Sequence, residues 1–535
     1  MEEDVLKTEK SDTVVISREE YDSLVALKTQ YAAMEKQLKW LMEQVALNRQ
    51  KRFGASSEKS EYDFNQISIF NEAEHFANVK AEEPKLTKIK EYYRKTRLTT
   101  DKLPLDLPEE VIDYELLPEE RICPECRGTL HEIGTEVIRE ELRLIPAQKS
   151  VVKHVRHTYG CRCCEKQSEK ATIIKAPVTE PVIKGSFASP EAVAHIMVQK
   201  YVMGSPLYRQ EKELTRQGIP LSRQTMSNWT IKCSEDWLEP IYELLHRKLI
   251  SHTVLAADET ELQVLKEPGK TAQSKSYLWV YRTGSDAVHP IVLSEYQPDR
   301  RAKRPIEFLK GFKGYLHTDG YGGYHKLPED ITVVGCWSHA RRYYDQALKA
   351  LPGKDREGTN ALRGKRYCDE LFAIERTLAD CSPDVRYKKR LELAKPVLGE
   401  YHNWLLSFRD VGKNLFGKAV NYSLGQWKYL ENYLLDGRLE ISNNRTERTV
   451  KMFVIDRKNF IFSNTPRGAK ASAIVFSLIE TAIENGLNPF DYLTYVFRNA
   501  PNWDIRNNKA NLSRLLPENV PDYIKVSAKK ACPPA

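Results

Sequence analysis

The chain has 535 residues, which is enough for about three or four domains, and its 82 basic and 74 acidic residues give a net charge of +8. This modest positive charge is compatible with nucleic-acid binding without establishing it. The acidic N-terminus lacks the apolar core of a signal peptide, and no apolar run approaches the roughly 18 residues of a membrane span, so we expect a cytoplasmic protein. Ten cysteines in such a chain favour free thiols or bound metal over a disulfide framework.

Apolar residues at alternating spacings of three and four predict a coiled coil over 17–50. The seam consists of Leu24, Leu27, Tyr31, Met34, Leu38, Leu41 and Val45. We therefore expect the chain to self-associate here, with a single amphipathic helix as the alternative. Residues 51–105 have mixed charge and few clustered apolar side chains, which indicates a linker.

Two pairs of cysteines with C-x2-C spacing predict a structural zinc site in a domain over 106–180. The expected ligands are Cys123, Cys126, Cys161 and Cys164, and Cys163 could substitute for a neighbour. Between the pairs lies a basic cluster that could contact phosphate, made of Lys149, Lys153, His154, Arg156 and His157.

Residues 185–240 have the outline of a helix-turn-helix. The segment 206–217 is amphipathic, Gly218 would end its helix, and Ser222 can cap a second helix over 223–233. In that second helix Met226 and Trp229 would pack inward, whereas the side facing DNA would present Arg223, Gln224 and Asn228. A plain helical hairpin has the same spacing and is the alternative.

Residues 253–265 place an acid where a buried strand should be apolar. Alternation puts Asp258 in the row of Val254 and Leu262, whereas Glu259 lies on the opposite face, which can be solvated. A carboxylate in an apolar row costs several kcal/mol unless it is paired, protonated or bound to metal. We therefore expect a cation beside Asp258.

Two later segments can complete a site with Asp258. Residues 313–324 predict a short strand that ends at Asp319 and then a turn built by glycines. Residues 442–456 predict a helix that carries Glu447 onto the sheet. Acids from two strands and a helix can bind two Mg²⁺ ions through their oxygens. Each acid alone also has an ordinary explanation: a strand-edge charge, a turn aspartate or a capping box with Asn444.

The order of the elements from residue 250 is that of a ribonuclease-H-like sheet. Strands are expected at 253–265, 275–284 and 287–296, then a basic helix at 300–312 and strands at 313–319 and 331–337. The following helix, at 338–351, presents His339, Arg341 and Arg342, which could hold DNA phosphates. We assign 250–345 and 426–480 to this α/β catalytic core and 346–425 to a helical insertion.

The C-terminal part carries further basic residues. After Glu447 the pattern predicts a hairpin and then a helix that stops at Gly486. Candidate contacts to the DNA backbone are Lys451, Lys458, Arg467 and Lys470. Residues 481–535 form a C-terminal segment, which we expect to be loosely ordered beyond about residue 500.

These segments together resemble a known family. The resemblance rests on DET at 258–260, HTDGYGGY at 317–324, CWSHARR at 336–342, SNNRTER at 442–448 and SLIETAIENGLNP at 477–489, together with the cysteine pairs and FGASSEK at 53–59. They are similar to the IS66 family of insertion-sequence transposases, and the resemblance covers nearly the whole chain. It implies a multidomain α+β bacterial DDE transposase in which Asp258, Asp319 and Glu447 match the catalytic acids.

The resemblance also implies a mechanism, cofactors and partners. Water would attack the phosphodiester at the element end, and the freed 3′-hydroxyl would attack target DNA, with Asp258 bridging two Mg²⁺ or Mn²⁺ ions about 3.5 to 4 Å apart. The resemblance further implies structural Zn²⁺. The implied partners are double-stranded DNA, a second copy of the chain and accessory proteins of the same element. We expect the protein to be associated with the nucleoid. Two other functions stay open: a nuclease of the same core without strand transfer, and a non-catalytic DNA-binding regulator.

Overall fold

The structure is a computed structural model, and it describes residues 17–31, 34, 150–155, 157–160, 173–175, 177–353, 356–408, 410–460 and 463–525. The chain divides into two compact units, Ser60–Val178 and the remainder. In the first, β1 (Thr158–Gly160) pairs with β2 (Ile173–Lys175) in an antiparallel ribbon. The predicted zinc cysteines and the FGASSEK segment lie outside the described residues.

Residues 18–31 form a helix at the start of the predicted coiled coil. The side chains of the seam that fall on this helix, Leu24, Leu27 and Tyr31, are all exposed. Most of the remaining seam lies outside the described residues, so the coiled coil stays a prediction.

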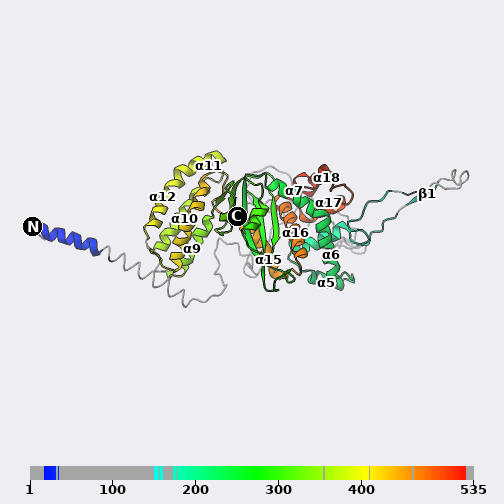
Figure 1. Ribbon diagram of the computed structural model, residues 1–535, viewed down its shortest axis with the longest axis horizontal. Helices are drawn as coiled ribbons and strands as arrows, with labels where there is room; N and C mark the ends of the chain where they lie inside the picture. Colours follow the sequence, from blue (N-terminus) through cyan, green and yellow to red (C-terminus); the bar gives the residue numbers. More distant parts are fainter. Residues whose placement is uncertain are drawn as a thin grey trace, which may run out of the picture. The chain divides into compact units, whose positions relative to one another are not determined.

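A five-stranded mixed sheet lies at the centre of the second unit, in the order β5-β4-β3-β6-β7 (Figure 1). The strands are β3 (Val254–Gln263), β4 (Lys275–Thr283), β5 (Val292–Gln297), β6 (Gly314–His317) and β7 (Ile331–Val334). β4 is antiparallel to both β3 and β5, whereas β6 is parallel to both β3 and β7. The predicted succession of strands is confirmed, and the helix between β5 and β6, α8 (Lys303–Phe308), is shorter than predicted.

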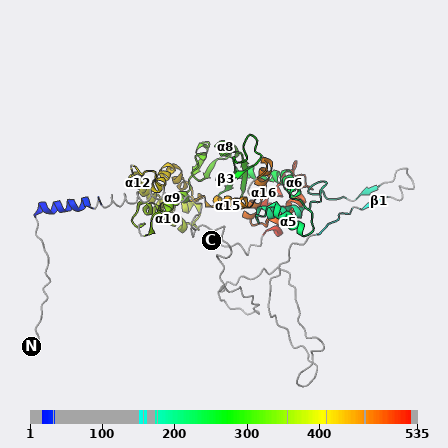
Figure 2. The ribbon, with the colours of Figure 1, turned by 90° about the horizontal axis from the view of Figure 1, so that it is seen from below.

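Two helices cover opposite faces of this sheet (Figure 2). On one face the ring of Phe308 in α8 stacks on Tyr281, with 3.8 Å between the ring centroids. On the other face α15 (Asn444–Phe460) buries Val450 and Phe453 against the strands. Asp258 pairs across the strands with Val280, which belongs to the core beneath α15, so Asp258 lies on the face that α15 covers.

Helix α16 (Pro466–Glu484) lies along the edge strand β5. The Thr481 hydroxyl accepts the N–H of Val292 and donates to its carbonyl oxygen, over 3.0 and 2.9 Å. The Ser477 hydroxyl accepts the N–H of Ser294 over 2.7 Å. These side chains satisfy backbone groups that an edge strand would otherwise leave open to another strand.

The predicted helix-turn-helix segment forms α5 (Leu207–Arg216) and α6 (Arg223–Cys233). Gly218 adopts a φ of +76° after α5, and the Ser222 side chain accepts the N–H of Thr225 at the start of α6. Met226 and Trp229 are buried, as predicted. Against α6 pack α4 (Pro190–Tyr201), η2 (Ser234–Leu238) and α16. In turn, α7 (Glu239–Leu249) and α17 (Pro489–Asn499) pack on these helices.

A group of helices follows β7 and lies to one side of the sheet (Figure 1). Its buried side chains form an aromatic core of their own. It consists of α9 (Trp337–Lys349), α10 (Asn360–Thr377), α11 (Pro383–Lys389), η5 (Arg390–Ala394), α12 (Lys395–Leu406), α13 (Leu415–Gly425), α14 (Trp427–Leu430) and η6 (Glu431–Leu434). The buried Arg390 pairs with Glu375 over 2.7 Å and donates to the carbonyl oxygens of Tyr433, Asp436 and Leu439. These bonds fix the segment that leads into α15.

Two predictions for the C-terminal part were wrong, and one was confirmed. The described residues after Glu447 form no hairpin, because Phe453 packs inward on the same helix and α15 continues to Phe460. Residues after 500 are folded as far as Lys525, with α18 (Lys509–Ser513) and with buried Leu512, Leu515, Leu516, Val520 and Ile524. Gly486, with a φ of +71°, follows the end of α16 as predicted. None of the helices in the described part of the chain has the length and apolar character that crossing a bilayer requires.

Candidate active site

The parallel pairing of β3 with β6 brings Asp258 and Asp319 together. Ala256 is level with His317, so the same register two residues further on places Asp258 beside Asp319. Asp319 lies in the loop after β6, where its Oδ1 accepts the N–H of Tyr321 over 2.8 Å. The charge of Asp319 acts on the Asp258 carboxyl, as does the charge of Glu447.

Glu447 enters the site from the first turn of α15. The start of this helix is attached to β3 by Asn443, whose Nδ2 donates to the carbonyl oxygen of Ala257 over 2.9 Å. The Glu447 carboxylate faces α9, where Arg342 Nη2 donates to Oε2 over 3.1 Å and His339 Nδ1 lies 3.7 Å from Oε1.

Burial is the largest cause that raises the pKa of Asp258 well above its usual range, and the neighbouring Glu259, Asp319 and Glu447 raise it further. The charged side chains that act on Asp258 are therefore acids. The cation that we expect beside Asp258 would therefore be a bound ion and not one of the described side chains.

The donor set fits a hard divalent cation. Acids crowd around a buried carboxyl, and clustered carboxylates repel one another unless a cation neutralises them. In addition, Glu447 Oε1 is buried and has no hydrogen-bond partner among the described residues. Oxygen ligands of this kind suit Mg²⁺ or Mn²⁺.

A second group of potential ligands shares Glu447. Ligand atoms of Cys336, His339 and Glu447 all lie within 4.8 Å of one another. Burial raises the pKa of the Cys336 thiol to about 11 and lowers the pKa of His339. His339 was predicted as a site residue from the sequence and Cys336 was not, although the C-x2-H spacing of CWSH was the available signal.

The prediction that Glu259 is solvated was wrong. Its carboxylate is buried on the face opposite Asp258, where it accepts the Tyr324 hydroxyl and Arg300 Nε, both over 2.6 Å. Burial and then Asp319 raise the pKa of Glu259, while Tyr324 and Arg300 oppose the rise. Because the Arg300 guanidinium lies 3.8 Å from the centroid of the Tyr321 ring, Glu259 anchors the loop that carries Asp319.

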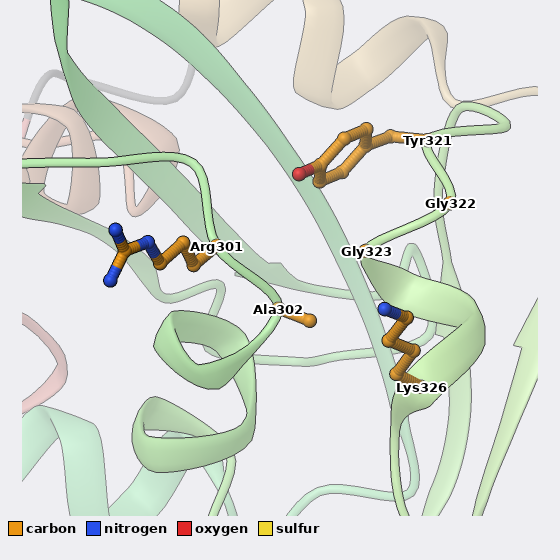
Figure 3. Close-up of a pocket in the computed structure, with 6 residues that line it drawn as sticks. All are labelled: Arg301, Ala302, Tyr321, Gly322, Gly323 and Lys326. Atoms are coloured by element: carbon orange, nitrogen blue, oxygen red, sulfur yellow. The ribbon is translucent and has the colours of Figure 1, made fainter.

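A hollow of about 510 Å³ opens beside this loop, between the approach to α8 and the glycine turn (Figure 3). It is lined by Arg301, Ala302, Tyr321, Gly322, Gly323 and Lys326. Arg301 and Lys326 are exposed, so two cationic side chains border the hollow.

The other residues that were predicted to contact DNA lie on three different helices, α6, α9 and α15. Arg223, Gln224 and Asn228 are exposed on α6. Arg341 faces the helices beyond β7, where its Nε donates to Asp369 of α10 over 2.5 Å. On α15, Lys458 is exposed and Lys451 is half-buried.

One known family matches a long segment of the chain. The family described as "Transposase IS66 family" matches residues 185–471, which is more than half of the chain and includes all three acids. The chain belongs to the IS66 transposase family. Family membership supports a role as a transposase and makes a nuclease or transposase activity the expected chemistry.

Three further matches place IS66 domains along the chain. A zinc-finger binding domain of IS66 transposases matches 120–165, which contains all four predicted zinc cysteines. A domain described as "Transposase C of IS166 homeodomain" matches 40–112, which includes the segment assigned to a linker, and the IS66 C-terminal element matches 477–517. The chain thus carries zinc-finger and leucine-zipper-like IS66 domains.

Similar proteins occur in Sinorhizobium fredii. Uncharacterized protein y4jD is 30% identical over 77% of this chain and 81% of its own length. Uncharacterized proteins y4qI and y4hP are each 28% identical, over 78% and 70% of this chain and 77% and 69% of their own lengths.

Proposed function

We propose that the protein is a DNA transposase that binds the ends of an insertion sequence, cuts there and joins the cut end to target DNA. The observation that carries the proposal is the meeting of Asp258, Asp319 and Glu447: the charges of the other two acids both act on the buried Asp258 carboxyl. Acids gathered around one buried carboxyl are suited to metal-dependent phosphoryl transfer.

The sheet supports a ribonuclease-H-like core. The first three strands are antiparallel neighbours, and the next two lie parallel to the first on its other side. One acid comes from the first strand, one from the end of the fourth and one from a helix on the sheet face. This order also agrees with the IS66 family match.

In the proposed reaction Asp258, Asp319 and Glu447 hold two divalent cations. When bound, these ions would activate the attacking oxygen and stabilise the leaving oxygen of an in-line displacement. Arg342 orients the Glu447 carboxylate from α9 by donating to its Oε2. We assign contacts with the DNA backbone to Arg301 and Lys326, because both are exposed cations that line the hollow beside the loop of Asp319.

Recognition of the element ends is assigned to other parts of the chain. On α6 the exposed Arg223, Gln224 and Asn228 would face DNA, and the zinc module would add a second contact. The exposed seam on 18–31 supports pairing of two chains through a coiled coil, which would bring two DNA ends together. Accessory proteins of the same element are proposed partners.

The test is cleavage of a labelled duplex that carries the native element end, in the presence of Mg²⁺ or Mn²⁺ or of EDTA. We expect metal-dependent nicking at the element boundary by the parent protein, and its loss in Asp258→Asn, Asp319→Asn and Glu447→Gln. The matched control is Asp330→Asn, an exposed acid near the same loop that pairs with Lys313. It should cut like the parent.

A second substrate separates the alternatives. A precut element end should be joined to target DNA by the parent protein; nicking without joining would instead indicate a nuclease. A regulator would bind the element end specifically and cut neither substrate, even after the accessory proteins are added.

A further inference from the structure

Cys336, His339 and Glu447 come from two segments that are attached to each other. Cys336 directly precedes α9, with His339 in the first turn, and Glu447 lies in the first turn of α15. The Trp337 N–H donates to the carbonyl oxygen of Ile441 over 3.1 Å. The three side chains are therefore held together by backbone bonds that do not involve the side chains themselves.

The atoms that face one another in this cluster lack other partners. His339 Nδ1 and Glu447 Oε1 are both buried, and neither has a hydrogen-bond partner among the described residues. They lie 3.7 Å apart, and Arg342 occupies only the other carboxylate oxygen, Oε2. A buried, unpaired donor or acceptor carries a free-energy cost, so its presence points to a missing ligand.

The sulfur of Cys336 completes the set. It lies within 4.8 Å of the ligand atoms of His339 and Glu447, and it accepts the backbone N–H of Asn443 over 3.2 Å. An amide that donates to sulfur stabilises a thiolate, and such supporting bonds are typical of sulfur ligands to metals.

We propose that Cys336, His339 and Glu447 form a binding site for a soft divalent cation, with Zn²⁺ as the representative ion. Sulfur, imidazole nitrogen and carboxylate oxygen are the ligands that Zn²⁺ takes, and three protein ligands leave one position open. Mg²⁺ prefers oxygen ligands alone, so the site discriminates between the two cations. Binding forms a bond between metal and sulfur and releases the thiol proton to solvent.

This site has a consequence for catalysis, which rests on the proposed function. Glu447 cannot be a full ligand in the Mg²⁺ site and in the Cys336–His339 site at the same time, because a cation bound to Cys336 and His339 would hold its Oε1 on the α9 side. The soft cation therefore competes with Mg²⁺ for Glu447 and inhibits cleavage. The protein would cleave DNA when zinc is scarce, and its cleavage would be inhibited when zinc is abundant.

The binding test uses the full chain with its zinc-finger domain already loaded with one equivalent of Zn²⁺. Co²⁺ is then titrated in, because a cobalt–thiolate bond gives a charge-transfer band and tetrahedral Co²⁺ gives visible bands. We expect one additional equivalent of Co²⁺ to give both signals. Cys336→Ser should lose the charge-transfer band, whereas Cys368→Ser, a buried free cysteine of α10, should keep it. Release of zinc is followed in parallel, to exclude exchange at the zinc finger.

The proposal would be overturned if the parent gave no cobalt–thiolate band, or if Cys336→Ser kept that band. If Cys336→Ser does not fold by circular dichroism, His339→Gln serves as the second variant, and it should weaken Co²⁺ binding at least tenfold. The same affinity in His339→Gln as in the parent would also overturn it.

The activity arm measures Mg²⁺-dependent nicking at increasing Zn²⁺. Relative to its own rate without Zn²⁺, Cys336→Ser should require at least tenfold more Zn²⁺ than the parent for half inhibition. The same Zn²⁺ sensitivity in both proteins would overturn the inhibitory role. Because the cobalt signal needs no catalysis, a protein that binds Co²⁺ at Cys336 without cutting DNA would contradict the proposed function and leave the metal site standing.

Discussion

The side-chain amide of Asn443 donates to the carbonyl oxygen of Ala257 over 2.9 Å, and this bond attaches the helix of Glu447 to the strand of Asp258. Asn443 is almost fully buried, and its own backbone N–H donates to Cys336. One residue thus sets the relative position of three segments that contribute to the candidate active site.

Asn443→Ala should therefore lower both stability and activity. The unpaired Ala257 oxygen costs about 1–3 kcal/mol of unfolding free energy. Misplacement of Glu447 should reduce nicking by on the order of 10- to 100-fold. Urea denaturation and the nicking assay measure the two effects.

Asn432→Ala is the matched control for Asn443. Its Nδ2 donates to the carbonyl oxygen of Val333 in β7 over 2.8 Å, away from the acids. It should lose stability and retain nicking activity. If both variants lost activity in proportion to stability, Asn443 would have no special part in placing Glu447.

Glu259→Gln should weaken catalysis through the loop of Asp319. A neutral amide cannot make the charge-assisted bond to Arg300, and Arg300 in turn supports the ring of Tyr321. We expect at least a tenfold loss of nicking, on the order of 1.4 kcal/mol, and a higher Mg²⁺ requirement. The control is Glu261→Gln, because Glu261 lies on the same strand but is exposed and pairs with Lys275. A Glu259→Gln protein with the parent's rate and Mg²⁺ requirement would contradict the positioning role.

The strands of the sheet could be predicted from the sequence, and the three acids could be singled out, because both leave local signals. Alternation around Asp258, the glycine turn after Asp319 and the helical spacing around Glu447 each occupy fewer than about fifteen residues. The capped turn between α5 and α6 was predictable for the same reason, since Gly218 and Ser222 mark it locally.

The environment of Glu259 could not be predicted in this way. Alternation assigns Glu259 to a face of β3, but its partners Arg300 and Tyr324 lie 41 and 65 residues further along the chain. Similarly, the hairpin prediction failed after Glu447 because β-branched and aromatic residues there also fit a helix that buries Val450 and Phe453 on the sheet. In both cases tertiary packing determined the result.

Substitutions on α6 should separate phosphate contacts from base contacts. Arg223→Ala should weaken binding to all duplexes and reduce the dependence of log Kd on log salt by about one. Gln224→Ala and Asn228→Ala should instead lose about 1–3 kcal/mol of discrimination between the element end and an unrelated duplex. Fluorescence anisotropy over a salt series measures both quantities. The control is Arg216→Ala, because Arg216 is an exposed cation at the end of α5. Equal effects of Arg216→Ala and Arg223→Ala would mean that α6 does not face DNA.

Glu480 on α16 should make the fold less stable as pH rises. Burial is the main cause that raises the pKa of Glu480 from 4.5 to about 7, and the nearby Glu484 adds to it. Between these values the folded chain holds a proton that the unfolded chain has lost, so stability falls as pH rises from about 4.5 to 7 and stays lower above it. The full loss corresponds to at most roughly 3 kcal/mol.

Glu480→Gln keeps the shape of the side chain and removes its titration. Urea denaturation at pH 8 should find the variant more stable than the parent, while at pH 4.5 most of the difference should disappear, because the parent then carries a protonated Glu480. Glu243→Gln, which changes an exposed acid of α7, removes the same charge from the surface and should change stability little at either pH. If the advantage of Glu480→Gln were equal at both pH values, it would come from packing, and Glu480 would not titrate near neutral pH in the folded chain.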